Sequence, residues 1–332
     1  MANTESAKEF LGSDFEKYRQ TLNLAIRSEE AYLDAINQYV LGRRGKEIRP
    51  VLSLLAGMAS GNLSSENYHI AAATEMLHTA TLMHDDVADA ANMRRGALSV
   101  SAMFSAGAAV LTGDFWLARS LDVLIRNCSH EILSNFTMAI QNMSEAELLQ
   151  LDKADSLDTT EEDYFKIIYG KTAAIFCASL KSAALAAGAD QERTDAIVRY
   201  AKNIGLAFQV RDDIIDYTPS LKAGKLPGAD LKERKITLPL LGAFANCPRQ
   251  ESRIKSRIRE IVNVFNGKFT KEEEDIVAEV SAFVMENGGI EYSTRKMEEL
   301  SSDAVRSLSV LPDSEAKNLL ADFAVFVGRR DA

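Results

Sequence analysis

The sequence has little proline and cysteine and no excess of basic residues, and each shortage excludes some classes of protein. It contains six prolines in 332 residues, well below an average usage of about 5%. The 38 Lys and Arg residues are outnumbered by 48 Asp and Glu residues, which gives a net charge of −10. A general nucleic-acid binder is therefore not expected, because such proteins neutralise phosphates with clustered basic residues.

The cysteines and the N-terminus indicate the compartment. Cys128, Cys177 and Cys247 lie far apart without CxxC spacing, so we expect small buried apolar residues rather than disulfides or metal ligands. Residues 1–10 contain Glu5, Lys8 and Glu9 but no apolar core, which predicts neither a secretory signal nor a mitochondrial presequence. No apolar run approaches the roughly 18 residues of a membrane span. The sequence predicts a cytoplasmic protein with no transmembrane segment.

What the sequence does have is helical periodicity almost from end to end, with sustained period-two alternation nowhere. Amphipathic or apolar windows with three- and four-residue spacing cover 15–40, 51–59, 64–89, 100–127, 131–153, 161–187, 194–217, 230–245, 251–265, 271–286, 291–307 and 314–327. The breaks between them are short, and no linker or internal repeat divides the chain. Several central windows are apolar nearly all round, as in helices inside a bundle. We therefore predict one all-α domain over residues 1–332, a single bundle of about 10 to 13 helices.

Two clusters of aspartates stand out against this apolar background. Asp85, Asp86 and Asp89 end one predicted helix, and the same spacing recurs in Asp212, Asp213 and Asp216. Residues four apart share a helix face, and two neighbouring carboxylates are costly unless a cation compensates them. Oxygen ligands without His or Cys suit Mg²⁺, which shares its coordination with substrate phosphates. One such cluster alone is more often a solvated helix end, but two copies favour a metal-dependent site.

Basic residues near these clusters indicate the ligand. They are Lys46 and Arg49 upstream, Arg94 and Arg95 after the first cluster, Lys171 in an apolar window, and Lys225 and Lys235 after the second cluster. Arg offers forked hydrogen bonds to phosphate and Lys a point charge. Each alone is an ordinary surface residue, but together with the aspartates they predict a site for one or two diphosphates held by Mg²⁺.

These motifs resemble those of the trans-polyprenyl diphosphate synthases. The resemblance rests on Asp85-Asp86-x-x-Asp89 followed by Arg94-Arg95-Gly96, and on Phe208 to Asp216 with its second aspartate cluster. It is supported by Gly45 to Pro50, Glu75 to His84, Gly113 to Phe115, Tyr169 to Ala173 and Lys235 to Pro239. It is dense over residues 40–245 and looser beyond, and it is most like the long-chain, octaprenyl-type enzymes.

The resemblance implies an isoprenoid synthase fold around a central cavity, usually in a homodimer. It implies head-to-tail condensation of an allylic diphosphate (geranyl, farnesyl or geranylgeranyl) with isopentenyl diphosphate. Carried over, Asp85, Asp89 and Asp212 would hold up to three Mg²⁺ ions, supported by Asp86, Asp213 and Asp216. The allylic diphosphate would bind Arg94, Lys171, Thr172, Gln209, Lys225 and Lys235. Isopentenyl diphosphate would bind Lys46, Arg49, His78 and Arg95, although Glu47 stands where the family usually has a basic residue.

Product length is predicted from the residues one turn before Asp85. In the family, aromatic residues there form a floor that stops the chain early, whereas Ala80 and Thr81 are small. The expected product is therefore a long-chain all-trans polyprenyl diphosphate, of the kind that becomes a quinone side chain. The alternatives are a geranylgeranyl or farnesyl diphosphate synthase, a terpene cyclase, and a non-catalytic subunit of a heteromeric prenyl synthase.

Overall fold

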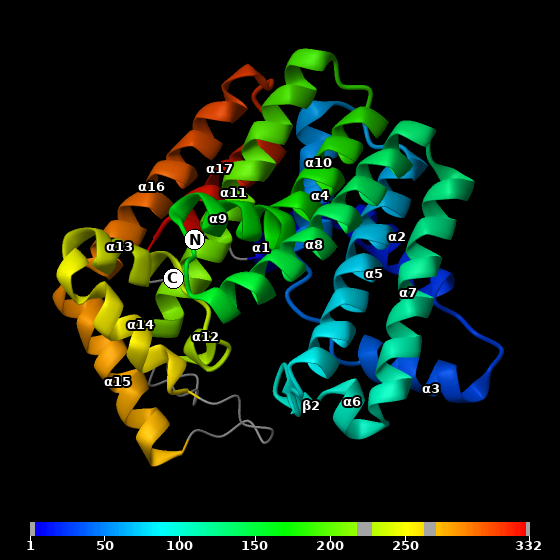
Figure 1. Ribbon diagram of the computed structural model, residues 1–332. Helices are drawn as coiled ribbons and strands as arrows, with labels where there is room; N and C mark the ends of the chain where they lie inside the picture. The colour runs from blue at the N-terminus through cyan, green and yellow to red at the C-terminus, as the bar shows by residue number, and fades with distance from the viewer. Residues whose placement is uncertain (1–3, 218–227, 262–269, 330–332) are drawn as a thin grey trace. The chain divides into compact units, whose positions relative to one another are not determined.

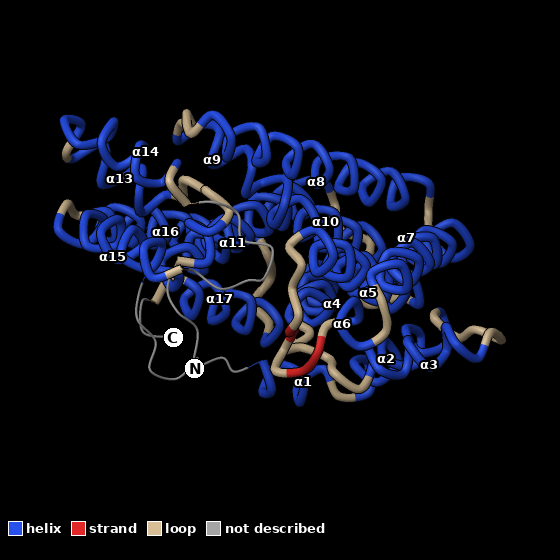
Figure 2. Tube along the Cα trace, turned by 60° about the horizontal axis from the view of Figure 1, so that its bottom comes forward, coloured by secondary structure: helices blue, strands red, loops and turns tan. Residues whose placement is uncertain are grey.

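The computed structural model describes residues 4–217, 228–261 and 270–329, and nearly all the elements in these ranges are helices (Figures 1 and 2). They form two compact units. The first contains residues 1–139, 175–199 and 307–323, and the second contains residues 140–174, 200–306 and 324–332. The helical content confirms the predicted all-α class. The single domain over 1–332 stays a prediction.

The first unit is built around one long helix. Its elements are α1 (Thr4–Leu11), α2 (Ser13–Ala25), α3 (Ala31–Leu41), α4 (Ile48–Ser60), α5 (Ser65–Ala88), β1 (Met93–Arg94), β2 (Ala97–Leu98), α6 (Val100–Met103) and α7 (Ala106–Asn127). Parts of α8 (His130–Ser156), α10 (Ala174–Ala186), α11 (Gln191–Tyr217) and α17 (Glu315–Val327) complete it. Helix α5 packs against α7 along much of its length and is also flanked by α2 and α4 (Figure 1).

The ends of α5 follow from local sequence. Ser64 is the N-cap, and it exchanges hydrogen bonds with Asn67 in a capping box. Asn67 also donates to the carbonyl oxygen of Ala183 at 2.8 Å, which ties the start of α5 to α10. Thr74 donates to Ser179 of α10 at 2.8 Å in the buried interior. The helix that carries the first aspartate cluster is therefore fixed by polar contacts as well as by its apolar faces.

The strands β1 and β2 form a hairpin, drawn red in Figure 2, that the sequence did not predict. Arg94 pairs with Ala97, so Arg95 and Gly96 form a two-residue turn. Their φ angles of 51° and 77° are both positive, as a type I′ turn requires. Two residues per strand are too short to show as period-two alternation. The Arg-Arg-Gly motif is therefore a turn that projects two arginines from neighbouring positions.

The second unit holds the other half of the chain. It contains the remainder of α8 and α11, α9 (Glu161–Ile168), a π-helical turn η1 (Tyr169–Ala173), α12 (Ala229–Lys232), α13 (Leu238–Asn246), α14 (Glu251–Arg259), α15 (Lys271–Glu286), α16 (Gly289–Ser307) and the end of α17. Short 3₁₀ turns, η2 (Pro248–Gln250) and η3 (Leu308–Val310), precede α14 and follow α16. No described helix is long and apolar enough to cross a membrane.

Two predicted helices are interrupted where side chains compete with helix geometry. The window 100–127 breaks into α6 and α7 because Ser105 caps a new helix by accepting from the backbone N–H of Ala108. The window 230–245 breaks because Arg234 adopts a left-handed φ of 54°. All three cysteines are free, but their predicted burial was wrong, because each is half-buried rather than fully buried. Burial nevertheless raises the pKa of the Cys128 thiol to about 12.

Candidate active site

The first aspartate cluster lies at the C-terminal end of α5. Asp85 is half-buried and Asp89 is exposed, one turn apart. Asp86 is only 3% exposed. Its Oδ1 accepts from Nε of Arg94 at 2.7 Å and also from the Nη2 of the same guanidinium. Arg94 therefore anchors the hairpin to the aspartate helix through a charge-assisted pair.

The structure brings together the four residues expected to bind isopentenyl diphosphate. Lys46, Arg49, His78 and Arg95 line one cavity of about 180 Å³ in the first unit, with Gly45, Glu47, Ile48 and Glu75. Arg95 packs so closely on Gly45 that a Cβ there would lie 2.7 Å from the guanidinium carbon. Glycine at this position therefore lets an arginine of the hairpin reach the cavity.

Two titratable groups in this cavity are strongly perturbed. Burial, aided by Arg49 and Arg95, holds the pKa of His78 well below its usual range. Its Nε2 lies 3.0 Å from Nη1 of Arg49, which suits a neutral imidazole that accepts from the guanidinium. Burial raises the pKa of Glu75 to about 7, although Arg49 and Arg95 oppose the rise. Sequence reasoning assigned Glu75 no role, because its burial beside these arginines is a tertiary feature.

Ala80 and Thr81 occupy the turn of α5 before the cluster. Ala80 is 1% exposed, while Thr81 is half-buried and donates to the carbonyl oxygen of His78 at 2.8 Å. Beyond them, His84 lies against Gly113 of α7, where a Cβ would come within 2.4 Å of the imidazole. The small residue at Gly113 thus permits close contact between the two helices next to the aspartates.

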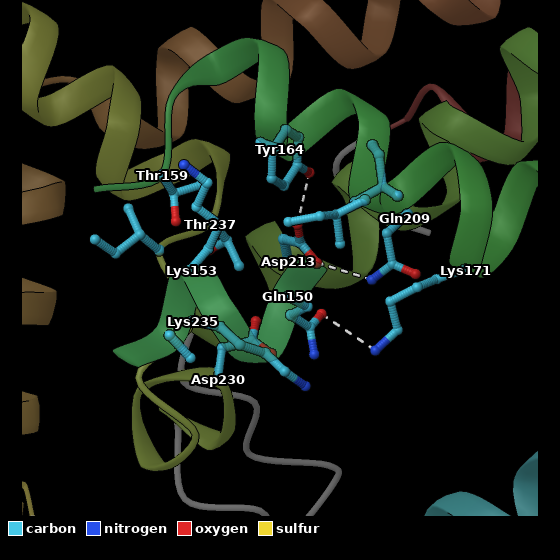
Figure 3. Close-up of a pocket in the computed structure, with 14 residues that line it drawn as sticks. Gln150, Lys153, Thr159, Tyr164, Lys171, Gln209, Asp213, Asp230, Lys235 and Thr237 are labelled. Atoms are coloured by element: carbon cyan, nitrogen blue, oxygen red, sulfur yellow. Dashed lines mark hydrogen bonds between the residues drawn. The ribbon is translucent and has the colours of Figure 1, made fainter. Parts of the chain in front are cut away.

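The second aspartate cluster lies at the end of α11 in the second unit, beside a cavity of about 80 Å³ (Figure 3). Among the predicted site residues, Lys171, Gln209, Asp213 and Lys235 line this cavity. Figure 3 shows them converging with Gln150, Lys153, Tyr164 and Asp230, which the sequence did not single out. Lys225 lies outside the described residues.

The three aspartates of the second cluster have different surroundings. Asp212 is exposed. Asp216 accepts from the backbone N–H groups of Ala229 and Asp230 at 3.0 and 3.1 Å, and so caps α12. Asp213 is 3% exposed, and burial raises its pKa well above the ordinary range.

A chain of hydrogen bonds holds Asp213. Tyr164 donates to Oδ2 at 2.6 Å, and Gln209 donates to Oδ1 at 2.9 Å. Gln209 in turn accepts from Thr172 at 2.7 Å. Three predicted residues are therefore linked through side chains, with Tyr164 as an additional member that only the fold reveals (Figure 3).

Lys171 is carried by the π-helical turn η1. Its Nζ lies 2.6 Å from Oε1 of Glu147 and donates to Gln150 at 3.1 Å, both on α8. The turn lies close to α8 because residue 170 is glycine, where a Cβ would come 2.5 Å from the carbonyl oxygen of Asn142. Irregular turns of this kind inside helices are frequent at functional sites.

The aspartates and the nearby basic side chains suit a metal ion that binds together with a phosphate-containing ligand. Within the part of the chain that the structure describes, no three His, Cys, Asp or Glu side chains form a ready-made metal site. Mg²⁺ characteristically takes one or two protein carboxylates and fills its other positions with water and substrate phosphate oxygens. Paired aspartates such as Asp85 and Asp89, with lysines and arginines nearby, provide that arrangement.

Comparison with known proteins agrees with this chemistry. Residues 30–274 match the family model described as polyprenyl synthetase. The chain belongs to the polyprenyl synthetase family. An all-trans-nonaprenyl-diphosphate synthase (geranyl-diphosphate specific) of Rhodobacter capsulatus is 35% identical, over 94% of this chain and 93% of that protein. An octaprenyl diphosphate synthase of Escherichia coli is 32% identical over 99% of each.

Solved structures of other polyprenyl synthetases share the architecture. A decaprenyl diphosphate synthase from Rhodobacter capsulatus aligns with a TM-score of 0.89 at 29% identity, over 98% of both chains. A polyprenyl synthase from Caulobacter crescentus, crystallised with calcium and isoprenyl diphosphate, aligns with a TM-score of 0.88 at 28% identity over 98% of both chains. The predicted fold class and family are thereby confirmed.

Proposed function

We propose that this chain is a Mg²⁺-dependent trans-prenyltransferase. It condenses an allylic diphosphate (geranyl, farnesyl or geranylgeranyl) with isopentenyl diphosphate, head to tail, and makes a long-chain all-trans polyprenyl diphosphate, with quinone side chains as the expected end use. The observation that carries the proposal is the sequence similarity of this chain, over almost its full length, to octaprenyl and nonaprenyl synthases. The cytoplasmic location expected from the N-terminus stays a prediction.

Isopentenyl diphosphate would bind in the cavity of the first unit. Lys46, Arg49 and Arg95 supply three positive charges around it, and a diphosphate is the anion that such a group recognises. Beside them, burial raises the pKa of Glu75 to about 7. A bound diphosphate favours its neutral form, which removes repulsion from the anion.

The allylic diphosphate would bind Arg94, Lys171, Thr172, Gln209 and Lys235. Lys225, which lies outside the described residues, is expected to bind it as well. Asp85, Asp89 and Asp212 would hold the Mg²⁺ ions, with Asp86, Asp213 and Asp216 in support. When bound, these ions stabilise the charge of the leaving pyrophosphate. The protein's own lysines and arginines orient the diphosphate and add to that stabilisation.

The reaction follows from this placement of charge. The allylic C–O bond ionises and leaves pyrophosphate and an allylic carbocation. The double bond of isopentenyl diphosphate attacks the cation and forms the new C–C bond. A proton then leaves the neighbouring carbon for the departing pyrophosphate, which restores a double bond. Apolar walls around the cation would give it no nucleophile to react with.

Chain length would be set on α5. Ala80 is buried, and the Thr81 hydroxyl donates to a carbonyl oxygen of its own helix. Both side chains are small, so neither has the bulk of an aromatic residue that would form a floor. Each added isoprene contributes apolar groups worth about 0.8 kcal/mol per buried CH₂, so an open path favours continued elongation. We propose a product longer than geranylgeranyl diphosphate on this ground.

Two copies of the chain would form a homodimer through α7. Leu111 and Ile125 are 70% and 62% exposed, and Ala118 lies between them on the same helix, also exposed. A seven-residue spacing places these three on one face. An apolar stripe of this kind is typical of a surface that packs on a second helix.

The test is a product assay. Purified protein is incubated with Mg²⁺, isopentenyl diphosphate and farnesyl or geranylgeranyl diphosphate, and the product masses are read by chromatography. We expect a series extending past geranylgeranyl diphosphate, and no turnover by folded Asp85→Ala or Asp212→Ala protein. A series that stops at farnesyl or geranylgeranyl diphosphate keeps the chemistry but contradicts the open floor at Ala80.

A second candidate is favoured by one relative. The chain is 32% identical, over 97% of each, to a protein of Geobacillus stearothermophilus named heptaprenyl diphosphate synthase component 2. A component that needs a partner, or a terpene cyclase, would give folded protein with no elongation from any primer. That outcome would overturn the proposal of a self-sufficient synthase.

A further inference from the structure

Glu47 is a buried carboxylate in the middle of the loop expected to bind isopentenyl diphosphate. Its side chain is 1% exposed, although Lys46 beside it is exposed. It is the residue before α4, yet it makes no capping hydrogen bond to that helix. Its φ of 53° is left-handed, a conformation that a non-glycine residue keeps only when its surroundings hold it there. The reason for this residue must therefore lie in its side-chain contacts.

Those contacts join the loop to the N-terminal helices. Tyr18 of α2 donates to Oε1 at 3.0 Å, and Arg19 of α2 donates to Oε2 at 2.7 Å. Lys8 of α1 and Arg44 of the loop itself lie 3.9 and 4.0 Å away. Both carboxylate oxygens are thus satisfied from the side of α1 and α2. The residue is positioned to brace the loop, and its side chain, 1% exposed, is turned to these partners rather than to solvent.

These contacts of Glu47 bear directly on the cavity expected to bind isopentenyl diphosphate. Lys46 precedes Glu47, and Arg49 lies two residues after it, at the start of α4. Arg95 rests on the backbone of Gly45, two residues earlier. The backbone conformation at Glu47 consequently sets how Lys46 and Arg49 lie relative to each other, next to the backbone that Arg95 contacts.

The charge of Glu47 fits the same role. The cavity gathers Lys46, Arg49 and Arg95, and like charges held close together repel one another when no anion is bound. A carboxylate fixed behind the loop offsets this repulsion and keeps the basic groups together in the empty site. Such preorganisation lowers the cost of binding.

We propose that Glu47 is a positioning residue for isopentenyl diphosphate, acting through Tyr18 and Arg19, which makes α2 part of the binding site. The proposal rests on the proposed function, since it concerns the affinity of that reaction's second substrate. A basic residue at this position would not accept these two hydrogen bonds, so the brace needs the carboxylate of Glu47.

The experiment is steady-state kinetics with each substrate varied while the other is saturating. We expect Glu47→Gln to raise the KM for isopentenyl diphosphate about ten-fold, as loss of one charge-assisted bond predicts. Tyr18→Phe, which keeps the ring, should raise it about three-fold. The KM for the allylic diphosphate and kcat should change less than about two-fold. Because Glu47 and Tyr18 share one network, the double variant should fall short of the product of the single effects.

Glu16→Gln is the matched control. Glu16 also lies near Arg19, at 3.7 Å, but it is 62% exposed, so its loss should leave both KM values unchanged. A merely structural Glu47 would lower the thermal midpoint of unfolding and leave the KM for isopentenyl diphosphate unchanged, and that result overturns the proposal. An equal rise in both KM values also overturns it. If Glu47→Gln does not fold, Tyr18→Phe carries the same test.

Failure of the proposed function is distinguishable from these outcomes. Wild-type protein that forms no product from isopentenyl diphosphate would refute the synthase activity itself. An active wild type with no selective change in the variants would refute only the positioning role.

Discussion

Glu75 is the residue of the first unit through which pH should act on binding. Burial raises its pKa to about 7, and the charged groups around it are Arg49, Arg95, Glu47 and Arg44, with His78 beside it in the cavity. Below pH 7 its carboxyl is neutral. Above pH 7 it becomes an anion facing the bound diphosphate. We therefore expect the KM for isopentenyl diphosphate to rise between about pH 6 and 8, and to rise less in Glu75→Gln.

The same ionisation affects stability with a defined sign. The folded-state pKa of about 7 exceeds the ordinary value of 4.5, so the folded state holds its proton more tightly and loses stability as pH rises through this range. The full cost is on the order of 3 kcal/mol. The thermal midpoint of Glu75→Gln should therefore rise relative to that of wild type between about pH 4.5 and 7 and keep the difference above pH 7. Exposed Glu29→Gln is the control, and parallel pH profiles for wild type and Glu75→Gln would contradict this account.

Tyr164 should act through Asp213. Tyr164→Phe removes the hydroxyl that donates to Asp213 at 2.6 Å and leaves a buried carboxylate oxygen without that donor, which costs about 1–3 kcal/mol. We expect lower kcat and a higher KM for the allylic diphosphate, with the KM for isopentenyl diphosphate unchanged. Tyr292→Phe, which removes a tyrosine bond to Glu161 outside the cavity, controls for general loss of stability. Equal kinetics in the two variants would exclude a role for Tyr164 in the site.

At the scale of elements, the close approach of η1 and α8 depends on one glycine. In Gly170→Ala the new Cβ would lie 2.5 Å from both the Asn142 oxygen and the Ala146 Cβ, and backbone cannot give way as a flexible side chain does. We expect a loss of about 1–3 kcal/mol in the free energy of unfolding, measured by urea denaturation, with weaker allylic binding because Lys171 follows directly. Gly107→Ala, where a Cβ would meet nothing within 4 Å, should change stability little. A neutral Gly170→Ala would show that the turn can move freely.

Element boundaries were predictable where a local signal marks them. The window 271–286 coincides with α15, which begins after a capping box at Thr270, and the window 64–89 begins at Ser64, the N-cap of α5. The hairpin at Arg94 to Ala97 and the left-handed break at Arg234 were missed. Arg234 is held by carbonyl oxygens of Ile261 and Arg259, which lie far along the chain, so no local pattern reveals it.

At the scale of the whole molecule, the sequence motifs located the site but did not identify the residues that support it. Lys46, Arg49, His78 and Arg95 were grouped by resemblance, and the structure places all four around one cavity. Tyr164 and Glu75 were not assigned roles, because a buried tyrosine or glutamate acquires its importance from partners such as Asp213 or Arg49 that only folding brings close. Motifs record which residue types the chemistry needs, whereas supporting residues depend on tertiary contacts.

The exposed apolar stripe on α7, formed by Leu111, Ala118 and Ile125, allows the proposed homodimer to be tested. Leu111 and Ile125 are the exposed apolar residues that a second copy would cover. The paired change Leu111→Glu with Ile125→Glu places charge on that face, and burying an unpaired carboxylate in an interface is strongly unfavourable. We expect wild type to have the mass of two chains by light scattering on a sizing column, and the paired variant the mass of one. Met285→Glu, on α15 and 45% exposed, should leave the mass unchanged. A wild type with the mass of one chain, or a paired variant that stays double, would show that this stripe is not what joins two copies.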